Sequence, residues 1–216
     1  MLEVIACSVA DAVEAEAGGA GRIELVRELG RGGMTPDLSL VREVLRAVSI
    51  PVRVMVRESE SHEVSDDAIK RRLFEAARAF GQLPLDGLVL GFLRGGRVDL
   101  AFTGELLAGA PRLKATFHRA FEDTEDPLRT IDDLKTLPQV DRILTGGDTE
   151  RLRNLAGRAR PEIEILAGGG IDGQAIGQLR QAGLREFHVG RAAREPAEVH
   201  GRVTRERVAE LRNWLP

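Results

Sequence analysis

The chain is poor in several residue types whose presence would define a protein class. Its 216 residues include one cysteine, Cys7, so no disulfide can form within the chain. Disulfide frameworks belong to oxidising compartments, and their exclusion favours a reducing one. The N-terminus also lacks the basic start and the long apolar stretch of a signal peptide. We therefore expect a cytoplasmic protein.

Aromatic residues, positive charge and long apolar runs are also scarce. The chain has no tyrosine, and its formal net charge is -3. Without aromatic side chains there is little surface on which single-stranded bases could stack, and without excess positive charge there is no field to attract nucleic acid. No apolar run approaches the roughly 18 to 20 residues that span a bilayer. We expect no nucleic-acid partner and no membrane partner.

What the chain does contain is a regular alternation of short apolar runs and segments with helical spacing. In one such segment Leu38, Val41, Leu45 and Val48 recur at the spacing of one helix face. The apolar runs occupy residues 2–6, 22–26, 52–56, 86–91, 113–117, 140–145, 163–168 and 186–190.

Eight runs give one repeat per about 27 residues, a plausible size for a strand–helix unit. No linker divides the chain. We predict an α/β fold with a single domain over residues 1–216, a (β/α)8 TIM-type barrel. A doubly wound sheet is the alternative, although it more often has fewer strands.

Alternation within the runs predicts which side chains point into the barrel. In residues 52–56 the three valines share one face, and Arg53 and Met55 share the other. The wholly apolar face should pack on the helices, so the mixed face should point inward. The same parity predicts these inward residues: Glu3, Ile5, Cys7, Arg22, Glu24, Thr116, His118, Glu164, Glu186 and His188. Both signs of charge are present, so the interior charges can pair with one another. The pairs could form a purely structural salt-bridge network or part of a functional site.

Several polar residues fall at strand ends, where barrel active sites lie. His118 ends the fifth run, and Glu24 and Arg57 lie near the ends of the second and third. His118 is a candidate general acid or base, with Glu24 beside it, and Arg57 is a candidate for holding a carboxylate or an enolate. Arg119 should face away and tie down the rim. His62, in the acidic loop after the third run, is expected to be a solvated histidine.

Glycines follow the last two runs, and backbone N–H groups at glycines can approach an oxyanion closely. In many barrels these two loops bind phosphate. The sequence therefore predicts an anion site here, although the same glycines would also serve tight turns. The candidate anion-binding residues are Gly168, Gly169, Gly170, Gly190 and Arg191.

Six segments of the chain together resemble the CutC family, which is named for copper homeostasis. The resemblance runs from Leu2 to about His188. It implies a TIM-type barrel, a cytoplasmic location, a homodimer or higher homo-oligomer, and Cu(I) binding as the activity. The segments are "LEVIACSVADAVEAEAGGAGRIEL", "GGMTPDLSLVREV", "IPVRVMVR", "DGLVLGFL", "TFHRAFEDTEDPLRTIDDL" and "RILTGG".

The resemblance makes Cys7 the candidate Cu(I) ligand. Many relatives carry further cysteines where this chain has Ala6 and Val26. Cu(I) favours soft ligands, commonly two or three of them, and a lone cysteine is also typical of a small buried apolar residue.

Two hypotheses therefore stand. The first is a CutC-family protein that binds Cu(I) at Cys7. The second is a barrel lyase, isomerase or epimerase that acts on a phosphorylated or carboxylated small metabolite through His118, Glu24 and Arg57. A non-catalytic scaffold or sensor is a third possibility, because a fold by itself does not fix a function.

Overall fold

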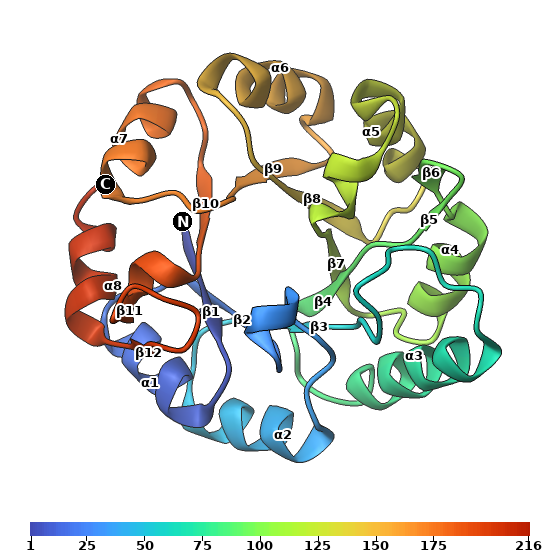
Figure 1. The fold of residues 1–216 in the computed structure, drawn as a ribbon, viewed down its shortest axis with the longest axis horizontal. Coiled ribbons are helices and arrows are strands. Elements are labelled where there is room, and N and C mark those ends of the chain that lie inside the picture. Colours follow the sequence, from blue (N-terminus) through green and yellow to red (C-terminus); the bar gives the residue numbers. More distant parts are fainter.

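Eight parallel strands close into a barrel, and each strand lies in one of the predicted apolar runs (Figure 1). The computed structural model describes residues 1–216. Neighbouring strands around the barrel are β1 (Leu2–Ala6), β2 (Arg22–Leu25), β3 (Val52–Met55), β4 (Gly87–Leu90), β7 (Lys114–Phe117), β8 (Val140–Thr145), β9 (Glu164–Ala167) and β10 (Glu186–Val189), which pairs with β1. The predicted (β/α)8 TIM-type barrel is confirmed.

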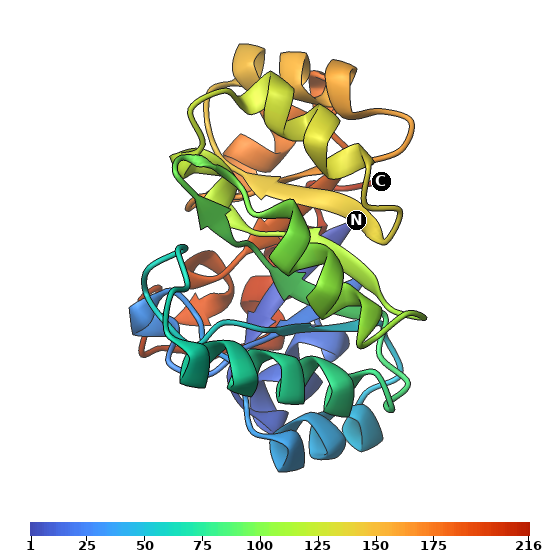
Figure 2. The same ribbon diagram turned by 90° about the vertical axis from the view of Figure 1, so that its right-hand side faces the viewer.

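Helices surround the barrel as an outer ring (Figures 1 and 2). Several begin at an aspartate that accepts backbone N–H groups, as Asp66 does from Ala68 and Ile69. No helix is both long enough and apolar enough for a membrane span. The helices are α1 (Val9–Ala17), α2 (Leu38–Ala47), α3 (Asp67–Phe80), α4 (Leu100–Ala108), α5 (Pro127–Lys135), α6 (Thr149–Ala159), α7 (Gly173–Gln181) and α8 (Arg205–Arg212).

Short elements decorate the loops that follow the strands. Two antiparallel hairpins, absent from the sequence predictions, follow β4 and β10, and three short 3-10 helices follow β2, β7 and β10. The hairpins are β5 (Leu93–Arg94) with β6 (Arg97–Val98), and β11 (Arg194–Glu195) with β12 (Arg202–Val203); the 3-10 helices are η1 (Leu29–Arg31), η2 (Arg119–Asp123) and η3 (Arg191–Ala193). In Figure 2 the loops after β2, β3 and β10 project at one end of the barrel, and both termini lie toward the other.

The predicted parity of the strands holds inside the barrel. Val52 and Val54 pack in the main core between strands and helices, whereas Arg53 is buried in the barrel interior. The Arg53 guanidinium contacts Asp86 Oδ2 at 2.6 Å and Asp141 Oδ1 at 2.8 Å. Charges in this part of the barrel are therefore paired, as burial requires.

The same interior network continues around the barrel. Arg142 Nε lies 2.6 Å from Glu186 Oε2, and Arg22 pairs with both Glu186 and Glu3. Glu164 does not join this network, because its carboxylate pairs with Arg160.

Candidate active site at the mouth of the barrel

A cavity of about 310 Å³ lies at the carboxyl ends of the strands. A larger hollow of about 750 Å³ lies on the outer face, between α3 and α4, where charged surface side chains line it. Seven of the nine predicted site residues line the barrel cavity, whereas Gly168 and Cys7 do not. The seven are Glu24, Arg57, His118, Gly169, Gly170, Gly190 and Arg191.

His118 follows β7 directly and begins η2. Its Nδ1 accepts the backbone N–H of Ala120 at 3.1 Å, so the proton of the neutral ring is on Nε2. That Nε2 is buried and has no hydrogen-bond partner. Burial lowers the pKa of His118 well below its ordinary value, and His62 and Arg57 lower it further. The ring is therefore a neutral N–H donor.

The position of His118 depends on a glycine in the neighbouring strand loop. A Cβ atom at Gly91, just after β4, would lie 2.5 Å from His118 Nδ1. Only glycine leaves room for the ring to lie this close to the β4 backbone.

Glu24, on β2, also has a buried oxygen atom without a hydrogen-bond partner. Its Oε2 accepts no hydrogen bond and lies 3.6 Å from Nδ1 of His188. Burial raises the pKa of Glu24 to about 7, and the negative charge of Glu3 adds to this against the opposing pull of His188. Near neutral pH this carboxyl group is therefore present in both protonation states.

Glu3 and His188 form a paired layer beneath Glu24. His188 Nδ1 lies 2.8 Å from Glu3 Oε1, and Arg22 contacts the other Glu3 oxygen. Burial opposes ionisation of Glu3, but Arg22 and His188 hold its pKa far below the ordinary value. Burial likewise opposes charge on His188, yet Glu24 and Glu3 raise its pKa.

The ligand atoms of Glu3, Glu24 and His188 all lie within 4.8 Å of one another, which is close enough for a metal ion. Oxygen and imidazole ligands of this kind suit a hard or borderline divalent ion rather than Cu(I).

The glycine loops after β9 and β10 form one wall of the cavity. Gly169 and Gly170 have φ angles of 90° and 88°, and their backbone N–H groups make no hydrogen bond within the protein. The N–H group of Gly190 is also free, and the exposed Arg191 lines the same wall. Three free N–H donors and an arginine are suitable ligands for an anion.

Arg57 lines the cavity but is also engaged by the surrounding loops. Its guanidinium donates to the carbonyl oxygens of Ser59 at 2.8 Å, Glu60 at 2.7 Å and Gly32 at 3.1 Å. Burial lowers the pKa of Arg57. These bonds fix the loop after β3, and only the remaining N–H groups can reach a ligand.

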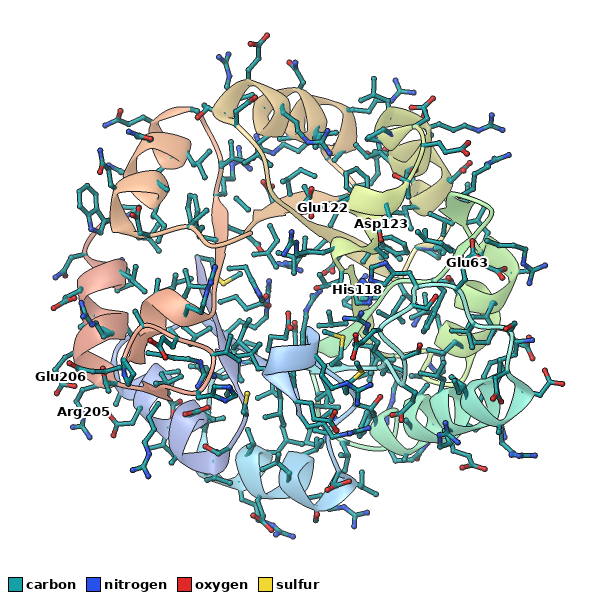
Figure 3. All side chains as sticks on the ribbon, in the orientation of Figure 1. Glu63, His118, Glu122, Asp123, Arg205 and Glu206 are labelled. Atoms are coloured by element: carbon teal, nitrogen blue, oxygen red, sulfur yellow. The ribbon has the colours of Figure 1, made fainter.

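Arg119 lines the cavity, so the prediction that it faces away was wrong, but it does tie down the rim. Its guanidinium contacts Glu122 at 2.6 Å, and Glu122 Oε1 accepts the backbone N–H of Gly146 at 2.9 Å. Figure 3 shows Glu122 beside His118 and Asp123 at this part of the mouth.

His62 lies over the cavity, and the prediction of a solvated loop histidine was wrong. Its side chain is 17% exposed, and its Nδ1 lies 2.7 Å from Asp123 Oδ2. The His62 ring centroid is 5.1 Å from that of His118. The backbone of Leu93, in β5, donates to the His62 carbonyl at 2.9 Å and holds the loop there.

Cys7 lies just beyond β1, outside the cavity, in a rim hollow of about 320 Å³. Its Sγ is 3.6 Å from Arg194 Nη2, and burial raises the pKa of the thiol despite this cation. His200 lines the same hollow, so one thiol and one imidazole are the softest ligands assembled there. This is a sparse set for Cu(I). The assignment of Cys7 to copper stays a prediction that rests on the family resemblance.

Comparison with known proteins gives consistent matches. The model of the CutC family matches residues 1–193. A protein named CutC from Xanthomonas axonopodis is 39% identical over 199 residues, covering 87% of this chain and 81% of that protein. The mouse copper homeostasis protein cutC homolog is 36% identical over 200 residues, covering 87% of this chain and 72% of the mouse protein.

Solved structures include a CutC protein and more distant barrels. The crystal structure of a protein named CutC from Streptococcus agalactiae superposes with a TM-score of 0.82 at 28% identity, covering 88% of this chain and 97% of that one. A thiamine phosphate pyrophosphorylase from Pyrococcus furiosus has a TM-score of 0.66 at 17% identity, over 99% of this chain and 94% of that one. The second likeness shows the barrel fold alone.

Proposed function

The chain belongs to the CutC family, and we propose that it is a barrel enzyme that moves protons next to a carbonyl group. The proposed reaction class is that of an isomerase, epimerase or lyase acting on a small phosphorylated or carboxylated metabolite. One observation carries the proposal: Glu24 Oε2 and His118 Nε2 are both buried without a hydrogen-bond partner, and both residues line one cavity. Buried polar atoms without a hydrogen-bond partner are rare because they destabilise the folded state. A ligand that forms hydrogen bonds with both atoms would explain why they are present.

His118 is proposed as the electrophilic donor. Because Nδ1 already accepts the Ala120 N–H group, the ring offers Nε2–H to the cavity and has no free lone pair. A substrate carbonyl oxygen would accept that hydrogen bond, which strengthens as negative charge develops on the oxygen. A low pKa keeps the ring neutral, so it acts as a donor throughout the working pH range.

Glu24 is proposed as the base. Its carboxylate takes a proton from the carbon next to the carbonyl, the C–H electron pair forms a C=C bond, and charge moves to the oxygen bound by His118. The protonated Glu24 then returns the proton to a carbon atom of the substrate. A pKa of about 7 for Glu24 suits both steps, because both protonation states are available near neutral pH.

The glycine wall is proposed as the anion subsite. The free N–H groups of Gly169, Gly170 and Gly190 and the guanidinium of Arg191 would bind a phosphate or carboxylate of the substrate. A cavity of about 310 Å³ is at the small end of the range for metabolite sites. We therefore expect a substrate of few carbon atoms.

Proton exchange with solvent tests this proposal directly. The protein is incubated in D2O with a panel of phosphorylated and carboxylated aldehydes and ketones, and proton NMR follows the loss of C–H signals. We expect exchange with at least one compound, roughly 100-fold slower in Glu24→Gln. Cys7→Ser is the matched control and should exchange at the wild-type rate. No exchange with any compound, or exchange that survives Glu24→Gln, would contradict the proposal.

Cu(I) binding at Cys7 is the second candidate, and the relatives named as copper homeostasis proteins favour it. An anaerobic Cu(I) titration against a competing chelator tests it, with Cys7→Ser and His200→Ala alongside. Tight binding of one copper per chain that is lost in Cys7→Ser would support a copper site. Equal binding by wild type and Cys7→Ser would exclude the thiol as a ligand. A cytoplasmic location and a homo-oligomer also remain part of the proposal.

A further inference from the structure

We propose that His62 is a second catalytic residue, a proton acceptor for a substrate hydroxyl group, and that the substrate is therefore an α-hydroxycarbonyl compound. The inference rests on the proposed function and adds a residue and a substrate class to it. His62 comes from the loop after β3, whereas His118 follows β7, and both line the same cavity.

The two histidines carry their protons on different ring atoms. The Asp123 carboxylate, 2.7 Å from Nδ1 of His62, can only accept, so the neutral His62 ring holds its proton on Nδ1. Its Nε2 then has a free lone pair. In His118 the arrangement is reversed, because Nδ1 accepts the Ala120 N–H group and Nε2 holds the proton.

The rings lie side by side, with centroids 5.1 Å apart and planes tilted by 49°. One donor beside one acceptor matches two oxygen atoms on adjacent carbons: a carbonyl oxygen accepts from His118, and a hydroxyl group donates to His62. A substrate without that hydroxyl would leave the His62 lone pair unused. Sites built to bind a hydroxyl group discriminate strongly against analogues that lack it.

These residues can move every proton needed to isomerise an α-hydroxycarbonyl compound, a reaction in which the carbonyl and hydroxyl groups exchange places on adjacent carbon atoms. Glu24 takes the proton from the carbon that bears the hydroxyl group, and His62 takes the hydroxyl proton. Glu24 then protonates the former carbonyl carbon, and His62 returns its proton to the former carbonyl oxygen. The positive charge on His62 during this exchange lies against Asp123. No oxidant, reductant or other reactant is needed.

Glu63 follows His62 in the sequence and lies on the same side of the barrel mouth as Asp123 (Figure 3). Its Oε1 accepts the backbone N–H of Gly95 at 2.8 Å. The His62 carbonyl is held as well, by Leu93. The chain is therefore held at His62 and at the residue that follows it, which gives the ring a defined position for proton transfer.

Two probes that differ by one oxygen test the inference by calorimetry. Phosphoglycolohydroxamate carries a phosphate and two oxygens on adjacent atoms, and 2-phosphoglycolamide lacks the second oxygen. We expect wild type to bind the hydroxamate at least about tenfold more tightly than the amide. In His62→Phe, which keeps a ring without nitrogen, this ratio should fall to about one while the amide still binds.

Two further variants complete the test. Asp123→Asn, at an exposed position, removes the charge that fixes the His62 proton and should lower the ratio several-fold. His200→Phe lies outside the cavity and should keep the wild-type ratio. Equal binding of both probes by wild type, or an unchanged ratio in His62→Phe, would overturn the inference and leave the anion site standing. No binding of either probe would count against the proposed function itself.

Discussion

Replacing Glu24 with glutamine should stabilise the protein above neutral pH while it removes the proposed base. Glu24 is buried, and its folded-state pKa of about 7 lies above the ordinary value of 4.5. Below about pH 4.5 both the folded and unfolded states hold the proton, so the group has no effect on stability. As the pH rises, the unfolded chain releases its proton first, and the folded state loses stability until about pH 7.

The size of this effect follows from the two pKa values. A gap between 4.5 and about 7 corresponds to about 3 kcal/mol, at about 1.4 kcal/mol per pH unit. Glutamine resembles the neutral acid and carries no charge at any pH. Glu24→Gln should therefore gain up to about 3 kcal/mol of unfolding free energy at about pH 8, and almost nothing at about pH 4.

Urea unfolding at a series of pH values measures this difference. Glu43→Gln, on the exposed face of α2, is the matched control, and it should stay within about 0.5 kcal/mol of wild type at every pH. A loss of stability at about pH 8 in Glu24→Gln would refute the reasoning. It would mean that the ionised carboxylate is stabilised by His188, 3.6 Å away, more than burial destabilises it.

Two other substitutions test the barrel interior and the anion subsite independently. Arg53→Met should cost about 1 to 3 kcal/mol of unfolding free energy in urea, because it removes the buried guanidinium that binds Asp86 and Asp141, while Asp141 keeps its contact with Arg142; an unchanged stability would contradict this. Gly170→Ala should weaken binding of inorganic phosphate about tenfold in calorimetry, because φ is 88° and the added Cβ would lie 3.4 Å from Arg191 Nη2. Gly183→Ala has the same kind of strain, with φ at 93° and open space around it, and unchanged phosphate binding is expected there.

Much of the barrel could be predicted because strand parity is a local property. The inward positions of Arg53 and Glu24 follow from alternation within single strands, and so does the pairing of opposite charges in a closed interior. His118 could be placed at the mouth for the same reason, since it directly follows the last residue of β7.

The rest of the site depends on how the loops fold over the barrel. His62 lies in a loop without alternation or helical spacing, and its position is set by contacts with Asp123 and Leu93, far away in the sequence. Just past a strand end the parity argument holds in one case and fails in another. His118 follows β7 and lines the cavity, whereas Cys7 follows β1 and lies outside the cavity, with its sulfur 3.6 Å from Arg194.

The protonation state of His118 is the most direct test of the central claim. Nitrogen-15 NMR of the histidine rings reports which ring nitrogen holds the proton, and His118→Gln assigns the signal among the four histidines. Burial and the Ala120 hydrogen bond predict a neutral ring with its proton on Nε2, and burial holds the pKa of His118 well below its ordinary value. Protonation near its ordinary pKa of about 6.5, or a proton on Nδ1, would contradict the proposed role of His118 as a neutral donor.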